Sequence, residues 1–275
     1  MTMHSKGWAI HRSMAALLVA VSGLVSGSML AAPAPPPAVL TADQIGKLLQ
    51  EGTDVLKQGN AELAIKNYFE PVNQSFMRQT AKAGADDEIY ATHSATETAA
   101  YTAKVAKENE GASKPLRLVT VDGTWTDALV LKARALAQLN HAPEALSALN
   151  QASTLSPGYP PVWLEMGSVY KSQKNWEQSF KAYKTAENDA GAIEDKSAQN
   201  LALASALRGQ AVAMIELGRL DDAETLYKRC LKMDPADTAA TDGLAQVQAR
   251  RATSAPAAGA ATPPSPAPPA VPSSR

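Results

Sequence analysis

Three segments of this 275-residue chain align on one another as a helical repeat. Two of them coincide after a shift of 34 residues, and a third follows the same pattern further along the chain. The matching positions carry small residues: Ala133, Ala145 and Ala152 in the first segment, Gly167, Ser179 and Ala186 in the second, and Ala211, Ala223 and Cys230 in the third. Small side chains at such offsets in amphipathic stretches mark places where two helices approach closely, so the period predicts stacked helical hairpins.

Each segment reads as two helices joined by a tight turn. Residues 127–139 place apolar side chains at helical spacing, and Pro143 opens a second helix in its first turn, where proline is tolerated. The run from Ser156 to Gly158, with a central proline, ends that helix.

The second segment resembles the tetratricopeptide repeat. The resemblance rests on Trp163, Met166, Gly167, Tyr170, Ser179, Tyr183 and Ala186. A weaker match near the start keeps the same spacing at Gly52, Val55, Gly59, Ala64 and Tyr68. Together these matches cover most of residues 45–236. The resemblance implies an all-α fold, in which helix-turn-helix repeats stack as an α-solenoid with a right-handed superhelix.

We therefore expect a solenoid over residues 41–251, with units near 45–78, 126–159, 160–203 and 204–237 and a capping helix at 238–251. Two stretches depart from the repeat. The first positions Pro160 and Ala204 are 44 residues apart rather than 34, which predicts a longer second helix or an ordered loop at 187–199. Residues 79–124 are interpreted as a degenerate repeat with a shortened second helix, because 85–107 is helix-like and 116–121 is short and β-branched. A small strand pair is the alternative.

The two ends of the chain have a different composition from its middle. Residues 1–32 carry Lys6 and Arg12, no acidic residue, and an apolar run from Met14 that thins into Ser and Gly, as in a secretory signal peptide. We expect a Sec-type signal and a periplasmic or secreted protein; the alternative is an inner-membrane anchor at 14–32. The Pro-rich stretch 33–40 reads as a linker, and the Ala/Pro-rich stretch 252–275 as a disordered tail.

Charge and cysteine content exclude several classes of function. Without Lys6, Arg12 and Arg275, the solenoid region keeps 23 basic residues against 27 acidic ones, a charge of −4, so neither nucleic acid nor an anionic membrane surface is an expected partner. Membrane contact is expected only if the N-terminal segment is uncleaved. The single cysteine, Cys230, excludes an internal disulfide and falls on a small, buried position of the repeat.

No motif for catalysis, a cofactor or a metal is evident. After export only His93 and His141 remain, far apart in sequence, and no nucleophile, phosphate-binding or metal-ligand pattern accompanies them. We therefore expect a protein that is not an enzyme and has no cofactor.

The resemblance also implies where a partner binds, because the first helix of each tetratricopeptide pair lines the concave face. Counting from the first position of each unit, the lining residues are Val130, Arg134, Gln138, Leu164, Ser168, Lys171, Arg208, Val212 and Glu216. They form a mixed groove that suits an extended or helical peptide, with Arg134, Lys171 and Arg208 available for acidic or carbonyl groups. The alternative interpretation is that these side chains are merely solvated.

The sequence leaves two classes of function open. The first is a scaffold or adaptor in the bacterial cell envelope that binds a protein or peptide in the concave groove. The alternatives are a self-assembling structural protein, which is a variant of the first class, and an accessory envelope enzyme with an unrecognised site in residues 72–124. The resemblance implies binding but names no ligand.

Overall fold

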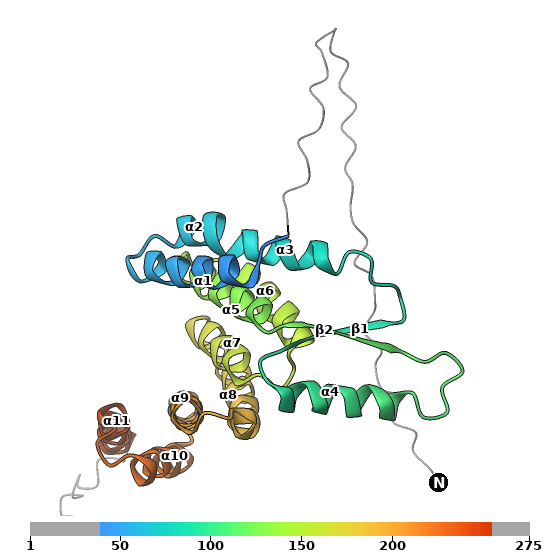
Figure 1. The fold of residues 1–275 in the computed structure, drawn as a ribbon. Coiled ribbons are helices and arrows are strands. Elements are labelled where there is room, and N and C mark those ends of the chain that lie inside the picture. The colour runs from blue at the N-terminus through green and yellow to red at the C-terminus, as the bar shows by residue number, and fades with distance from the viewer. Residues whose placement is uncertain (1–38, 255–275) are drawn as a thin grey trace, which may run out of the picture. The chain divides into compact units, whose positions relative to one another are not determined.

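The computed structural model describes residues 39–254 (Figure 1). The predicted signal peptide at 1–32, most of the linker at 33–40 and nearly all of the tail at 252–275 lie outside the described residues. The described residues divide between two compact units, with the boundary between Pro157 and Gly158. None of the helices in the described part has both the length and the apolar character needed to cross a bilayer.

The described part of the first unit holds two helical hairpins. Helix α1 (Ala42–Lys57) begins at Thr41, whose side chain accepts from the Gln44 backbone in a capping box. It pairs with a continuous helix made of α2 (Ala61–Ala64), a π-helical turn η1 (Ile65–Phe69) and α3 (Glu70–Gln79). The second hairpin is α5 (Thr124–Gln138) and α6 (Ala142–Leu155). Helix α5 packs directly against the first hairpin, so the two are neighbouring repeats.

Residues between these hairpins form a β-α-β excursion. Strand β1 (Asp87–Thr92), helix α4 (Ala95–Glu108) and strand β2 (Arg117–Asp122) build a two-stranded parallel sheet, paired from Asp87 with Arg117 to Thr92 with Asp122. The expectation of a degenerate repeat at 79–124 was therefore wrong, and the strand pair is the correct account. The predicted helix over 85–107 is confined to α4.

The physical reason lies in where the apolar side chains are buried. Tyr90 of β1 stacks on Tyr101 of α4 with ring centroids 4.4 Å apart, and Val105 and Leu118 complete this small core. Parallel strands need a crossover connection, which α4 provides. Tyr101 and Val105 of α4 are therefore buried against the sheet rather than against another hairpin. Helix α4 lies alongside the two strands (Figure 1).

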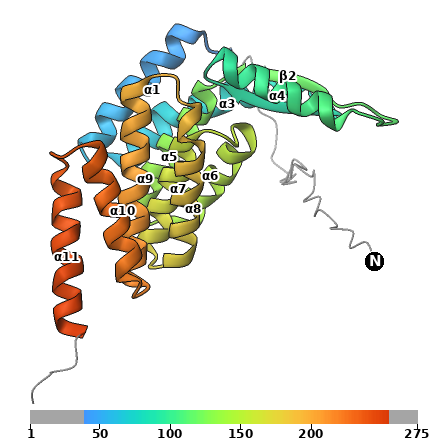
Figure 2. The ribbon, with the colours of Figure 1, turned by 90° about the horizontal axis from the view of Figure 1, so that it is seen from below.

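The second unit contains only helices in its described part (Figure 2). Helices α7 (Pro160–Ser172) and α8 (Trp176–Asp189) form one hairpin, and α9 (Lys196–Glu216) and α10 (Leu220–Met233) the next. Helix α11 (Thr238–Ser254) packs against α9 and α10 at the end of the array.

The additional residues at 187–199 lengthen a different helix from the one expected. Helix α8 ends at Asp189, and a 3-10 turn η2 (Ala190–Ala192) leads to Asp195, whose side chain accepts from the Ala198 backbone and caps α9. The insertion therefore extends the first helix of the third hairpin at its N-terminus. This start at residue 196, rather than 204, positions the candidate site.

A glycine pair explains how α7 and α9 approach each other. The Tyr183 ring of α8 lies between Gly167 and Gly209, where an added Cβ would come within 2.9 Å and 2.5 Å of ring carbons. The Ser179 hydroxyl donates to the Gly167 carbonyl at 2.9 Å. Burial of Gly167 between helices of one repeat, expected from the sequence, is confirmed.

Candidate functional site

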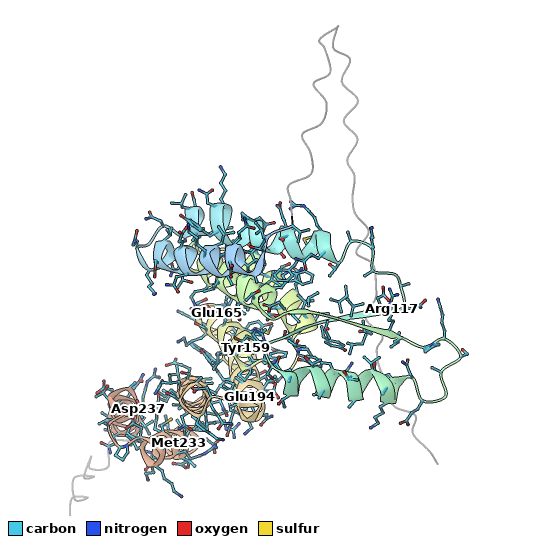
Figure 3. The ribbon with its side chains drawn as sticks, viewed as in Figure 1. Arg117, Tyr159, Glu165, Glu194, Met233 and Asp237 are labelled. Carbon is cyan, nitrogen blue, oxygen red and sulfur yellow. The ribbon has the colours of Figure 1, made fainter. Side chains whose placement is uncertain are left out.

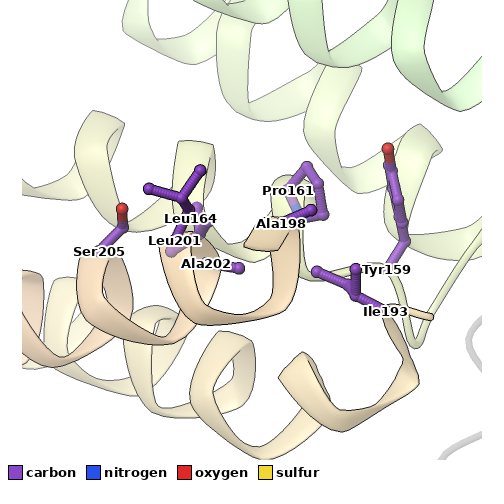
Figure 4. Close-up of a pocket in the computed structure, with 8 residues that line it drawn as sticks. All are labelled: Tyr159, Pro161, Leu164, Ile193, Ala198, Leu201, Ala202 and Ser205. Carbon is purple, nitrogen blue, oxygen red and sulfur yellow. The ribbon is translucent and has the colours of Figure 1, made fainter. Parts of the chain in front are cut away.

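An apolar groove lies between α7 and α9 in the second unit. Its volume is about 340 Å³, within the range of roughly 300–1,000 Å³ usual for ligand pockets. The lining residues are Tyr159, Pro161, Leu164, Ile193, Ala198, Leu201, Ala202 and Ser205 (Figure 4). Tyr159 and Ile193 lie at one end, Ser205 lies at the other, and Leu164 and Leu201 lie between them. The groove can therefore take aliphatic or aromatic side chains.

Leu201 is the most exposed large apolar side chain among those lining the groove, with 66% of its surface accessible. It sits on the N-terminal extension of α9, and the packing of Tyr183 between Gly167 and Gly209 holds this helix close to α7. An exposed leucine beside an open groove is an apolar surface that a ligand can remove from water.

A charge cluster around Glu187 links α9 to its other neighbours. Glu187 of α8 accepts from Gln210 of α9 at 2.9 Å and from Arg229 of α10 at 2.6 Å. Burial opposes the charge on this carboxylate, but hydrogen bonds from Lys184, Gln210 and Arg229 outweigh burial and lower the pKa of Glu187 to about 2. Helix α9, which supplies half of the groove, is therefore also linked to α8 and α10 through Glu187.

Of the predicted lining residues in the second unit, Leu164 alone lines this groove. Ser168 is half-buried and hydrogen-bonds the Tyr183 side chain, while Lys171 is exposed and Val212 is half-buried further along the face. These residues follow the helical spacing that the sequence predicted. The groove, however, is lined by the N-terminal parts of α7 and α9, and most of the predicted residues lie nearer the C-terminal ends of these helices.

Two predicted partner-binding charges are already paired within the chain. Arg208 donates to Asp237, which is buried at the start of α11, and Glu216 accepts from Arg250 at 2.7 Å. Both pairs tie α11 to α9. The expectation that Arg208 is available to a partner is therefore corrected, because recruiting its guanidinium would leave a buried carboxylate unpaired.

The three remaining predicted residues lie on α5 in the first unit. Val130 is buried, whereas Arg134 and Gln138 are exposed. Val130 is thus a core residue and is not available to a ligand, which corrects its assignment to the lining. Neither Arg134 nor Gln138 belongs to the groove between α7 and α9.

The sequence reasoning missed Leu201, Ser205 and Ile193. The signal was nevertheless present, because Glu216, Val212 and Arg208 continue backward at helical spacing to Ser205, Leu201 and Ala198. Because Ala204 was taken as the first position of the third unit, Leu201 and Ala198 fell before the unit and were not considered as lining residues. Ile193 precedes the helix and carried no periodic signal.

A second cluster, around His93, lies in the region where an unrecognised enzyme site was considered. The Nδ1 atom of His93 is 3.4 Å from Glu97, and Nε2 is 3.2 Å from Asp127. Burial opposes protonation, but the bonds to Asp127 and Glu97 outweigh burial and raise the pKa of His93 to about 9. The ring also packs on Gly123, where an added Cβ would lie 2.5 Å away.

With a carboxylate on each ring nitrogen, His93 is a structural cation at neutral pH rather than a general base. It joins the end of β1, the start of α4 and the start of α5. Among residues 39–254, no three His, Cys, Asp or Glu side chains come together in a way that could hold a metal ion.

Comparisons with known proteins agree with the helical architecture. Residues 210–237 match the family model described as "Tetratricopeptide repeat". The solved structure of Pseudomonas aeruginosa pilF is similar with a TM-score of 0.50 and 10% identity, covering 77% of this chain and 70% of pilF. The structure of MamA from Desulfovibrio magneticus RS-1 has a TM-score of 0.44 and 12% identity, and the match covers 79% of this chain and 100% of MamA. The first TPR of Spaghetti (RPAP3), bound to an HSP90 peptide, has a TM-score of 0.41 and 20% identity. The match covers 48% of this chain and 99% of that structure.

At these identities the likeness concerns the fold. A search of curated proteins found no match to the chain. Tetratricopeptide folds are in general protein-interaction modules and typically not enzymes. The matched repeat at residues 210–237, the stacked hairpins and the small residues at their contacts together give this chain the fold of tetratricopeptide-repeat proteins.

Proposed function

We propose that this protein is a non-enzymatic scaffold that binds a peptide or protein partner through apolar side chains in the groove between α7 and α9. The observation that supports this proposal is the open apolar groove with Leu201 exposed along it. Burying one large aliphatic or aromatic anchor there would contribute roughly 1.5–3 kcal/mol. The hydroxyl of Ser205 offers a polar group at the end of the groove.

Apolar contacts are expected to contribute more to partner binding in this groove than ion pairs do. Arg208 and Glu216 are already paired with Asp237 and Arg250, so they hold α11 rather than a ligand. Lys171 lies on the same helix as Leu164 and is exposed, so it supplies a cation to a partner longer than the groove.

Selection from a displayed library of random peptides on the immobilised full chain tests this proposal. The selected peptides should share large apolar side chains. Replacing Leu201 or Leu164 with Gln should weaken their binding tenfold or more, since about 1.4 kcal/mol is a factor of ten. The matched control is Met233→Gln at the end of α10, which replaces another exposed apolar residue outside the groove (Figure 3).

Three results would count against the groove. These are binding that both leucine variants retain, equal loss in the Met233 control, and a selection that returns only polar peptides. Circular dichroism melts of the leucine variants should match the parent, because Leu201 and Leu164 are not core residues.

We further propose that the scaffold acts in the cell envelope after export. The support is the charged, apolar and small-residue order of residues 1–32. Mass spectrometry of the protein released from cells by osmotic shock should find a mature N-terminus between about residues 29 and 40. Intact Met1 on membrane-bound protein would instead favour the anchor at 14–32.

A further inference from the structure

The two outer edges of the β1-β2 sheet differ in what covers them. The Arg117 N–H donates to the Asp86 carbonyl at 2.7 Å, and the Gly123 N–H donates to the Thr92 carbonyl at 2.9 Å. Both bonds point toward β1. Because backbone groups alternate in direction along a strand, the N–H and C=O groups of Leu118, Thr120 and Asp122 point away from β1.

The outer edge of β1 is partly occupied within the chain, where α6 packs against this strand. The Ser156 hydroxyl donates to the outward carbonyl of Ala91 at 2.7 Å, and the Asp87 N–H donates to the Gly84 carbonyl at 3.2 Å. No residue of the described range 39–254 bonds the outward backbone groups of β2. Strand β2 therefore carries the open edge of this sheet.

A side chain sets the length of that edge. The Asn109 side chain donates to the Leu116 carbonyl at 2.9 Å and accepts from the Leu116 N–H at 2.7 Å. Both backbone groups of Leu116, the residue just before β2, are therefore already hydrogen-bonded. The open edge thus begins at Leu118, ends at Asp122 and is centred on Thr120.

We propose that β2 pairs with β2 of a second copy of this chain, antiparallel, about a two-fold axis at Thr120. An edge with three outward residues is complementary to itself, because Thr120 then faces Thr120 of the partner subunit and Leu118 faces Asp122 of the partner subunit. This register forms roughly six backbone hydrogen bonds and leaves no outward group of β2 unpaired.

Side chains and space agree with this pairing. Val119 would face Val121 of the partner subunit, and both lie half-buried on the face away from α4, where β-branched pairs are favourable. Two strand spacings of about 4.8 Å would place the two α4 helices roughly 10 Å apart, a normal helix-packing distance. The sheet would grow from two strands, which are marginal alone, to four.

The edge also lacks the features that usually prevent such pairing. Strand β2 contains neither proline nor lysine. Its one cation, Arg117 (labelled in Figure 3), donates two hydrogen bonds to Asp87, each 2.7 Å long. This inference does not depend on the groove of the second unit. It gives the self-assembling alternative from the sequence a defined surface.

Light scattering on the full chain across the micromolar range tests the proposal. The parent and Thr120→Val should show twice the monomer mass, whereas Thr120→Pro should be monomeric or at least tenfold weaker. Because the Thr120 N–H points away from β1, proline leaves the β1-β2 pairing intact, as at other edge strands. A monomeric parent, or a Thr120→Pro variant that still dimerises, would overturn the proposal.

A charge exchange keeps the test independent of folding. Thr120→Glu and Thr120→Lys should each be monomeric, since each places like charges opposite one another at the two-fold axis. An equimolar mixture of the two should recover the dimer. If the parent dimerises but the mixture stays monomeric, Thr120 does not face itself and the proposed register is wrong.

Discussion

Replacing Gly209 with Ala tests whether α7 and α9 approach each other through the Tyr183 ring. The new Cβ would lie 2.5–2.6 Å from three ring carbons, closer than atoms pack without a shift. The ring cannot move away freely, because it packs on Gly167 on its other side, so closely that a Cβ added there would lie 2.9 Å from ring carbons, and Ser168 hydrogen-bonds the Tyr183 side chain. Overpacking of this kind costs about 1–3 kcal/mol.

The gain in helix propensity, about 1 kcal/mol, must be separated from that cost. Gly46→Ala on α1 is the matched control, because nothing lies within 4 Å of its added Cβ. It should be stabilised by the full propensity gain, so the two variants should differ by about 1–3 kcal/mol in unfolding free energy. At about 2–4 °C per kcal/mol for a protein of 150–250 residues, their melting temperatures should separate clearly.

Urea and thermal unfolding followed by circular dichroism give the comparison. Combining Gly209→Ala with Tyr183→Leu should reduce the penalty, since the shorter side chain leaves room for the Cβ. The reasoning fails if Gly209→Ala stabilises the protein as much as Gly46→Ala does.

Two further predictions concern residues outside the groove. Protonated His93 stabilises the fold, and its pKa is raised from 6.5 to about 9, so this stabilisation is complete below pH 6.5 and is lost as the pH rises through 9. Urea midpoints should therefore fall between pH 6.5 and 9 more steeply in the parent than in His93→Asn; equal slopes would contradict the assignment. Lys174 has a positive φ of 57° in the turn between α7 and α8, so Lys174→Gly should raise the unfolding free energy by about 1 kcal/mol. Gly218→Ala, at φ 76° in the equivalent turn, should lower the unfolding free energy by a similar amount, and midpoints that move the other way would contradict the turn geometry.

Much of the helical array was predictable from the spacing of small residues. Ala145, Ala152, Ser179, Ala186 and Ala223 are all fully buried, because a repeat of fixed length returns the same helix contact to the same position. The turns followed the same logic. Asn140 and Lys174, 34 residues apart, both adopt positive φ where the other hairpins carry Gly59 and Gly218.

The candidate site was less accessible to this reasoning. The groove depends on where α9 begins, and the Asp195 cap lies outside the repeat pattern. The pairing of Arg208 with Asp237 depends on where α11 docks, which no local pattern specifies. Charges on a predicted face are therefore available to a partner only if the rest of the fold leaves them unpaired.

The sequence by itself determined the repeat, the close helix contacts and the absence of recognisable catalytic motifs, because these depend on local spacing and residue type. Only the tertiary structure decided that residues 87–122 form a parallel strand pair, since Tyr90 and Tyr101 could stack on each other or pack into a repeat with equal local plausibility. It also decided which edge of that sheet stays open and which face of α9 carries the groove. These outcomes depend on contacts between residues distant in sequence, and local periodicity carries no information about such contacts.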